Sequence, residues 1–469
     1  MKKTAIVYGE YCGTTRKAIE LLTQFLLDET GEYPACHKAE GFVPREGVRY
    51  LYVGTASNNP LVGEKTDKVL THPEEYYIRV KEDEVLIQGS DEGGMLYGCV
   101  DFYCKYLLPM STNHDHLKPY FENLFADTLP DFSLVSHPDV KDRGIWTWGH
   151  VIFDYKGFID NMVKCKMNTL IVWDDFPPVN AREMTDYAHL CNVKVIWGYA
   201  WLWDTDFSKI TREYIDSNVD SIVALYEEKY KDLGGDGIYF QSFTELNSEY
   251  VNGLLIAEAV TDFVNLVSGR ILEKYPELEL QFGLHSMSVK EKLPYIQKVD
   301  KRVRITWEDC GAFPFAYRPN ELEGFGEMVE FTKKITNLRS TQEQTDKFGV
   351  VLKGLTSLDW SLFEHQQGPF VLGTCSERFL DKNVRRKEKI WKYVQAYWLA
   401  NADRALEVIR SLQQDKAGEL CITALVEDGL FEKKMYFPVA LYAEMLWNTG
   451  ADLKVLMAET AQRDWVDFA

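Results

Sequence analysis

The regular alternation of short apolar segments with amphipathic segments is the feature that most constrains the fold of this chain. From Arg143 onward the alternation is typical of parallel βα units. The predicted strands are Gly144–Trp148, Thr169–Trp173, Val193–Tyr199, Gly237–Phe243, Leu278–Leu284, Val303–Trp307, Val350–Leu355 and a weaker Phe370–Leu372. Eight strands within about 230 residues match the size of a (β/α)8 TIM barrel. A doubly wound open sheet is the alternative, disfavoured because no glycine-rich phosphate loop follows a strand.

The segments on either side of the barrel differ from it in pattern. The pattern of residues 1–135 predicts a small α/β domain, with a hairpin over Tyr77–Ile87 and a glycine-rich helix that ends before Pro109. Residues 136–380 hold the predicted barrel. Residues 381–469 predict a C-terminal helical region, with helices over 387–412, 417–425 and 438–447. No low-complexity linker separates the three parts, so we expect them to pack as one body.

Charge and composition exclude several classes of partner. The net charge of −20 repels polyphosphate backbones, so we expect no nucleic-acid partner. No apolar run reaches the roughly 18–20 residues needed to span a bilayer, and the N-terminus lacks the long apolar core of a signal peptide. Nine dispersed cysteines without a CxxC pair indicate reduced thiols. We therefore predict a cytoplasmic protein without a membrane partner. A homo-oligomer is compatible with the sequence.

Aromatic, acidic and histidine residues gather where the predicted strands end. The carboxyl ends of the strands form the reactive face of a βα barrel. Eight of the twelve tryptophans lie at these ends or just beyond them. Flat rings offer platforms to sugars, and carboxylates bind hydroxyl groups, so we predict a carbohydrate substrate. The residues predicted to shape the sugar pocket are Trp148, Asp174, Trp203, His285, Trp307 and Asp359.

Three carboxylates are candidates for catalysis. Glycoside hydrolysis needs a protonated carboxyl at the leaving oxygen and a second carboxylate. Strand alternation places Glu245 and Glu308 toward the barrel interior, with Asp309 at the start of the following loop. We therefore predict Glu245 as general acid and Glu308 or Asp309 as the second carboxylate. The alternative for each acid is a solvated loop residue or a structural ion pair.

Two stretches resemble known glycoside hydrolases. The segment Tyr77–Pro109 resembles the small domain that precedes the barrel in β-hexosaminidases and in α-glucuronidases. Arg143-Gly144 matches the arginine–glycine pair that holds sugar hydroxyls in family 20 hexosaminidases. The resemblance covers roughly residues 1–310 and implies a sugar-binding role for Arg143.

The resemblance has one departure. Family 20 places an Asp-Glu pair after the fourth strand, where the Asp orients the acetamido group of the substrate. This chain has Thr244-Glu245 there, so the acid is kept and its partner is missing. The arrangement of family 67-type α-glucuronidases, a lone acid after strand four with carboxylates on later strands acting as base, fits at least as well.

The sequence therefore favours an exo-acting glycoside hydrolase without a metal or cofactor. A non-catalytic carbohydrate-binding barrel is one alternative, and Thr244 is its main support. A metal-dependent hydrolase barrel is another. It is opposed by the missing His-x-His motif on the first strand and by the isolation of His285.

Overall fold

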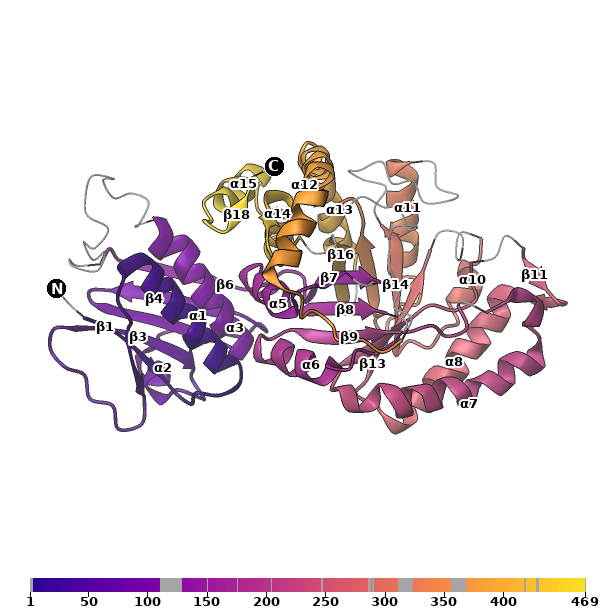
Figure 1. The fold of residues 1–469 in the computed structure, drawn as a ribbon, viewed down its shortest axis with the longest axis horizontal. Coiled ribbons are helices and arrows are strands. Elements are labelled where there is room, and N and C mark those ends of the chain that lie inside the picture. The colour runs from indigo at the N-terminus through magenta and orange to yellow at the C-terminus, as the bar shows by residue number, and fades with distance from the viewer. Residues whose placement is uncertain are drawn as a thin grey trace.

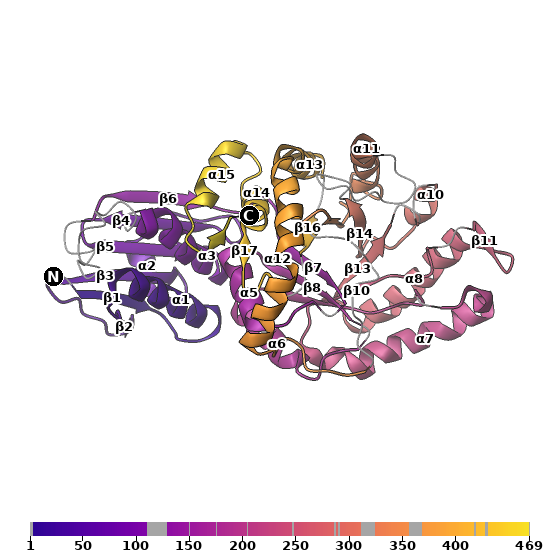
Figure 2. The same cartoon turned by 45° about the horizontal axis from the view of Figure 1, so that its top comes forward.

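An α/β domain, a barrel and a set of C-terminal helices follow one another in the computed structural model (Figure 1). It describes residues 3–109, 129–149, 151–174, 176–203, 205–245, 248–285, 288, 291–310, 324–355, 368–416, 419–426 and 430–468. The N-terminus lies in the α/β domain, and the C-terminus lies beside the last helices, next to the barrel (Figures 1 and 2).

The N-terminal domain is built on a six-stranded mixed sheet of order β2-β1-β3-β5-β4-β6. Its strands are β1 (Lys3–Tyr8), β2 (Ala35–Lys38), β3 (Val48–Thr55), β4 (Tyr76–Lys81), β5 (Glu84–Gly89) and β6 (Phe132–Ser136). Its helices are α1 (Gly13–Thr30), α2 (Pro60–Lys65) and α3 (Glu92–Phe102), and a π-helical turn (Tyr103–Leu107) continues α3. The expected hairpin is present as the antiparallel pair β4–β5. Apolar residues of α1 and α3 pack on one face of the sheet. Strand β2 is an edge strand, and all four of its residues are exposed.

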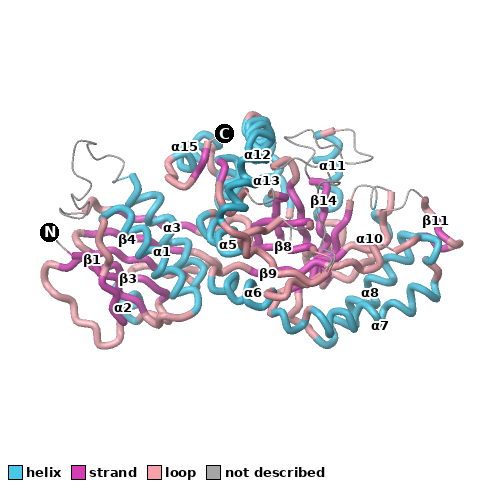
Figure 3. The backbone as a smooth tube through the Cα atoms, viewed as in Figure 1, coloured by secondary structure: helices cyan, strands magenta, loops and turns pink. Residues whose placement is uncertain are grey.

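Eight parallel strands form a closed barrel, which confirms the predicted fold class. In chain order they are β7 (Asp142–Trp148), β8 (Thr169–Trp173), β9 (Lys194–Gly198), β10 (Gly237–Phe240), β13 (Glu279–Leu284), β14 (Val303–Cys310), β15 (Phe348–Leu352) and β16 (Leu420–Leu425). Almost all of their residues are buried, because helices cover the outside and side chains fill the inside. Figure 3 shows the strands ringed by helices.

Helices connect and cover the barrel strands. They are α5 (Tyr155–Lys164), α6 (Ala181–Leu190), α7 (Arg212–Lys229), α8 (Ile256–Lys274), α10 (Leu293–Ile296), α11 (Phe325–Thr336), α12 (Glu377–Leu399), α13 (Ala402–Asp415), α14 (Phe437–Trp447) and α15 (Leu453–Ala461). Two short strand pairs lie outside the barrel: β11 (Tyr250–Val251) with β12 (Leu254–Leu255), and β17 (Met435–Tyr436) with β18 (Val466–Asp467). No helix in the described ranges is long and apolar enough to cross a membrane.

The strand that closes the barrel differs from the prediction. Phe370–Leu372 is not a strand: the Phe370 carbonyl accepts a hydrogen bond from the Val179 amide, and Leu372 bonds to the side chain of Asn180. The eighth strand is β16, inside the region predicted to be helical, and it pairs with β15 and β7. All six of its residues are buried. A short run buried on both faces has no alternation, so periodicity cannot distinguish it from a buried helix.

The N-terminal domain packs on the amino ends of the barrel strands, and Arg143 lies in this interface. Its guanidinium pairs with Glu74 of the N-terminal domain at 2.7 Å and stacks over the rings of Tyr97 and Trp447. Arg143 is the second residue of β7, at the rim opposite the carboxyl ends. The predicted sugar-binding role of Arg143 is therefore wrong, because the side chain is 1% exposed and faces the other domain.

A buried ionic cluster also joins the three parts of the chain. Lys166, which precedes β8, lies 3.1 Å from Asp101 of α3 and 3.2 Å from Glu444 of α14. Arg463, after α15, approaches Glu444 at 2.6 Å. The Lys166 and Asp101 side chains are fully buried, so each charge depends on its partners, and the parts pack as one body.

Candidate active site

Four predicted site residues meet at the carboxyl ends of the barrel strands. Glu245 follows β10, His285 follows β13, and Glu308 and Asp309 lie near the end of β14. Neighbouring parallel strands end at one rim, so residues far apart in the sequence are brought together there. The predicted placement of Glu245 and Glu308 at one mouth is observed.

His285 is the centre of this cluster. Its Nε2 atom lies 3.0 Å from Glu308 Oε2 and 3.3 Å from Glu245 Oε1, and its Nδ1 atom lies 3.4 Å from Asp309 Oδ1. One imidazole ring therefore touches all three predicted catalytic carboxylates. The three acids differ in access to solvent: the side chain of Glu245 is 29% exposed, that of Asp309 3% and that of Glu308 0%.

The Glu308 carboxylate accepts hydrogen bonds from Tyr239 of β10 and from Gln241, which directly follows this strand. The Tyr239 hydroxyl donates a hydrogen bond to Oε1, and Gln241 Nε2 donates to the same oxygen at 2.6 Å. Burial alone would raise the pKa of Glu308, but the charge of His285 and its hydrogen bond, followed by Lys353, lower it. Glu308 is thus an ionised carboxylate in the barrel interior.

A bulge in β14 places Glu308 and Asp309 in the same cluster. The pairing with β15 shifts between Trp307 and Cys310, so two residues of β14 stand opposite one residue of β15. Adjacent strand residues ordinarily point to opposite faces, and the bulge lets both acids reach His285. Asp309 also lies 3.3 Å from the Nζ atom of the fully buried Lys353, just after β15.

The charge of His285 is set by its neighbours. Burial opposes the imidazolium form, but the carboxylates of Glu308 and Asp309 outweigh it and raise the pKa of His285 to about 10. At neutral pH the ring is a cation whose two N–H groups face carboxylates. The shorter contact of Nε2 is to Glu308 rather than to Glu245.

This raised pKa predicts a pH dependence of stability. The folded-state pKa of about 10 lies above the ordinary value of 6.5, so the contribution of His285 is complete below pH 6.5 and is lost as the pH rises through 10. The free energy of unfolding should therefore fall from pH 6.5 to pH 10 more steeply in the native protein than in His285→Gln. Urea unfolding at pH steps across this range measures both slopes. Parallel slopes would show that His285 is neutral when folded.

Tryptophans line the same end of the barrel. Trp203 Nε1 donates a hydrogen bond to Glu245 Oε1 at 3.1 Å. Behind it, the rings of Trp148 and Trp173 stack with centroids 4.6 Å apart, and Trp148 meets Trp203 edge-on at 5.4 Å. Trp203 is half-buried, whereas Trp148 and Trp173 are buried. Trp203 is therefore the ring that borders Glu245, and the other two hold it in place.

The remaining predicted pocket residues divide into three cases. Asp174 follows β8 at the same end of the barrel and is 4% exposed. Trp307 was wrongly predicted to bind sugar: its Nε1 atom donates to Thr332 Oγ1 of α11 at 3.0 Å, so the ring points out of the barrel. Asp359 lies outside the described residues.

Three residues of the cluster were not predicted as site residues. Tyr239 and Gln241 lie on the inward face of β10 and beyond its end, in line with the predicted alternation, but phenol and amide groups carry no catalytic signature of their own. Lys353 directly follows the apolar run of β15. A charged residue at the end of a buried strand is the sequence signal that could have identified it as a site residue.

Gly283 of β13 makes room for the Tyr239–Glu308 contact. A Cβ atom at Gly283 would lie 2.1 Å from the Tyr239 hydroxyl oxygen and 2.2 Å from Glu308 Oε1. We expect Gly283→Ala to lower the free energy of unfolding by about 1–3 kcal/mol, because the packed barrel interior cannot absorb the methyl group. Gly269→Ala on α8, where a Cβ meets nothing within 4 Å, is the control and should stabilise by about 0.4–1 kcal/mol. Equal effects in urea unfolding would contradict this account of Gly283.

Comparison with known proteins finds likeness in structure but not in sequence. No protein-family model and no curated protein matches the chain. A GH138 enzyme targeting pectin rhamnogalacturonan II has a TM-score of 0.55 and 14% identity over 96% of this chain and 51% of its own. CpGH84B has a TM-score of 0.57 and 13% identity over 98% of this chain and 70% of its own. Both carry glycoside hydrolase family designations. At such identities the likeness shows the fold, and this chain spans about half the length of the GH138 enzyme.

Proposed function

We propose that this chain is a glycoside hydrolase that uses Glu245 as its general acid. The proposal rests on one set of contacts at the barrel mouth. The Glu245 carboxyl is accessible to solvent, is bordered by Trp203, and shares the Nε2 atom of His285 with the ionised Glu308. Cleavage of a glycosidic bond needs two carboxyl groups, and Trp203 offers a flat aromatic face beside them. The glycoside hydrolase designations of both structural neighbours agree with this assignment.

The exposure of the three acids supports the roles that we propose for them. Glu245 is the most exposed, so it is the carboxyl that a leaving-group oxygen can reach, and its position beside Trp203 orients it. Glu308 is kept ionised, as a base or nucleophile must be, and it is the second carboxylate in this proposal. Asp309 contacts the Nδ1 side of the His285 ring and is itself paired with Lys353.

The spacing of the two carboxylates bears on the stereochemical outcome, and we propose retention of anomeric configuration. Glu245 Oε1 and Glu308 Oε2 contact the same nitrogen at 3.3 and 3.0 Å, so these oxygens are at most about 6.3 Å apart. Retaining enzymes hold their carboxyl groups about 5–5.5 Å apart and inverting enzymes about 6.5–9.5 Å apart. The ring of His285 covers Glu308, so attack by Glu308 on the sugar carbon requires this ring to move aside. Nuclear magnetic resonance of the first-formed sugar distinguishes the two outcomes.

A panel of aryl glycosides tests the function. We expect the native protein to release phenol from at least one member. A pectic oligosaccharide belongs in the panel, because one structural neighbour targets pectin. We propose the exo mode as well, in which product analysis of an oligosaccharide shows a single terminal sugar at early times. A ladder of internal fragments would contradict the exo mode.

A non-catalytic carbohydrate-binding barrel is the second candidate. One observation favours it: Thr244 precedes the acid where family 20 has an Asp, and it is buried with its hydroxyl accepting a hydrogen bond from Ser288 Oγ at 2.9 Å. We also propose the closer likeness to family 20 or family 67-type enzymes. Sugar binding without any turnover across the panel would favour this candidate over the hydrolase.

A further inference from the structure

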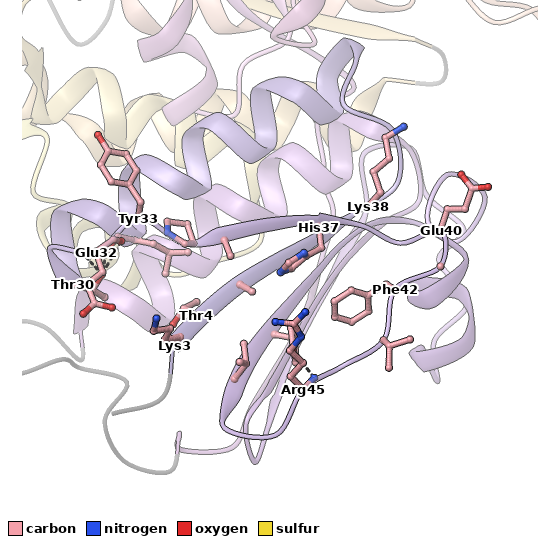
Figure 4. Close-up of a pocket in the computed structure, with 18 residues that line it drawn as sticks. Lys3, Thr4, Thr30, Glu32, Tyr33, His37, Lys38, Glu40, Phe42 and Arg45 are labelled. Carbon is pink, nitrogen blue, oxygen red and sulfur yellow. Dashed lines mark hydrogen bonds between the residues drawn. The ribbon is translucent and has the colours of Figure 1, made fainter.

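A cavity of about 990 Å³ opens on the N-terminal domain, away from the barrel mouth. Its floor is the edge of the sheet, where β2 runs parallel to β1, and its wall is the loop that joins β2 to β3 (Figure 4). The strand register places Ala5, Tyr50, Ala35 and His37 on the same face of the sheet, opposite α1 and α3. The two alanines leave the depth of the cavity open, because neither side chain fills it.

Aromatic rings and one arginine shape this cavity. Phe42 meets Tyr50 edge-on at 5.0 Å and lies 5.5 Å from the His37 ring. The Arg45 amide donates to the Tyr50 hydroxyl at 2.8 Å, which fixes the loop. Figure 4 shows the Arg45 side chain beside the rings of His37 and Phe42. An apolar surface and a cationic group therefore face the same space.

The positive groups of the cavity differ in whether a carboxylate of the protein neutralises them. Lys38 is paired with Glu10 at 2.8 Å. In contrast, among the residues that the structure describes, no carboxylate lies within ion-pair distance of Lys3, His37 or Arg45. Glu40 lies beside Lys38 at one end of the cavity, and Glu32 lies at the other end (Figure 4). In a chain with a net charge of −20, an unneutralised cationic group beside an aromatic wall is a local exception to the overall field.

We propose that this cavity is an accessory binding site for a carboxylate-bearing saccharide, such as a uronic-acid oligosaccharide. Arg45 binds the carboxylate through its planar fork of N–H donors, and Phe42 packs against the C–H face of the sugar ring. His37 adds a second hydrogen-bond donor. The choice of a saccharide rests on the proposed function, whereas the requirement for an anion comes from the cavity itself.

The test uses the full chain carrying Glu245→Gln, so that binding is measured without turnover. We expect trigalacturonate to protect residues 33–50 from hydrogen exchange and to bind with an affinity that falls as salt is raised. Arg45→Ala in the same background should weaken the affinity measured by titration calorimetry at least tenfold, and Phe42→Ala should do the same. Arg182→Ala, which removes an exposed arginine from α6, is the control and should stay within twofold.

Three results would overturn the proposal. These are no protection of residues 33–50, equal protection by the neutral trisaccharide maltotriose, and equal protection by inorganic phosphate alone. The first result would show that the cavity does not bind the saccharide. The second would show that binding does not depend on the carboxylates, and the third would show a general anion site. Because the readout is confined to residues 33–50, it does not depend on hydrolysis at the barrel. If the protein binds trigalacturonate here but cleaves no glycoside, the proposed function is wrong and the accessory site still stands.

Discussion

Replacing Glu245 by glutamine is expected to lower the turnover of glycosides with poor leaving groups by about 10²–10⁴-fold, the usual share of general acid catalysis. Glutamine keeps the size of the side chain and an oxygen that can accept the Trp203 hydrogen bond. It removes the proton that the leaving oxygen must receive. Aryl glycosides with acidic phenols need little protonation and should lose much less activity. Steady-state rates on a matched pair of substrates, one with each kind of leaving group, measure the difference.

The control for this substitution is Glu249→Gln, which neutralises an exposed acid four residues further along the same loop. It should leave both rates unchanged. Equal losses for both leaving groups in Glu245→Gln would indicate a role in sugar binding rather than in proton transfer. Unchanged rates on both substrates would show that Glu245 is not the general acid, which would leave Glu308 and Asp309 as the candidates.

The parts of the fold and site that follow local rules could be predicted from the sequence. The alternation of strands and helices predicts a barrel, because parallel strands need crossover helices and only a few architectures satisfy that order. In such a barrel all strands end at one rim, so Glu245, His285 and Glu308 could be expected to meet there before any distance was known. Their contacts through His285 agree with that expectation.

The parts that depend on contacts far apart in the sequence could not be predicted. The bulge in β14 follows from its pairing with β15, and without it Asp309 would be expected to point away from His285. The buried run of β16 has no periodicity that separates strand from helix. Trp307 is a different case: the alternation that places Glu308 inward also places Trp307 outward, as observed, so a tryptophan at a strand end is not by itself a sugar contact.

Arg143 shows how a local motif can match a family while the residue serves another purpose. The Arg143-Gly144 pair resembles a sugar-binding motif, but the two residues occupy the amino end of β7. A Cβ at Gly144 would lie 1.7 Å from the Thr169 carbonyl oxygen, so the glycine is needed for strand packing. Arg143 itself connects the barrel to Glu74, and Asn168 and Asn192 donate to the same carboxylate. These contacts assign Arg143 to domain packing.

Arg143→Ala is therefore expected to lower the free energy of unfolding by about 3–5 kcal/mol, the usual loss when one partner of a buried ion pair is removed. The values of kcat and KM of the folded protein should change by less than about twofold, because the guanidinium lies at the rim opposite Glu245. Lys141→Ala is the matched control: its pair with Glu419 is exposed on both sides and should contribute no more than about 1 kcal/mol. Urea unfolding and steady-state kinetics on the same preparations give both quantities. A tenfold rise in KM with unchanged stability would restore the sugar-binding role that the motif suggests.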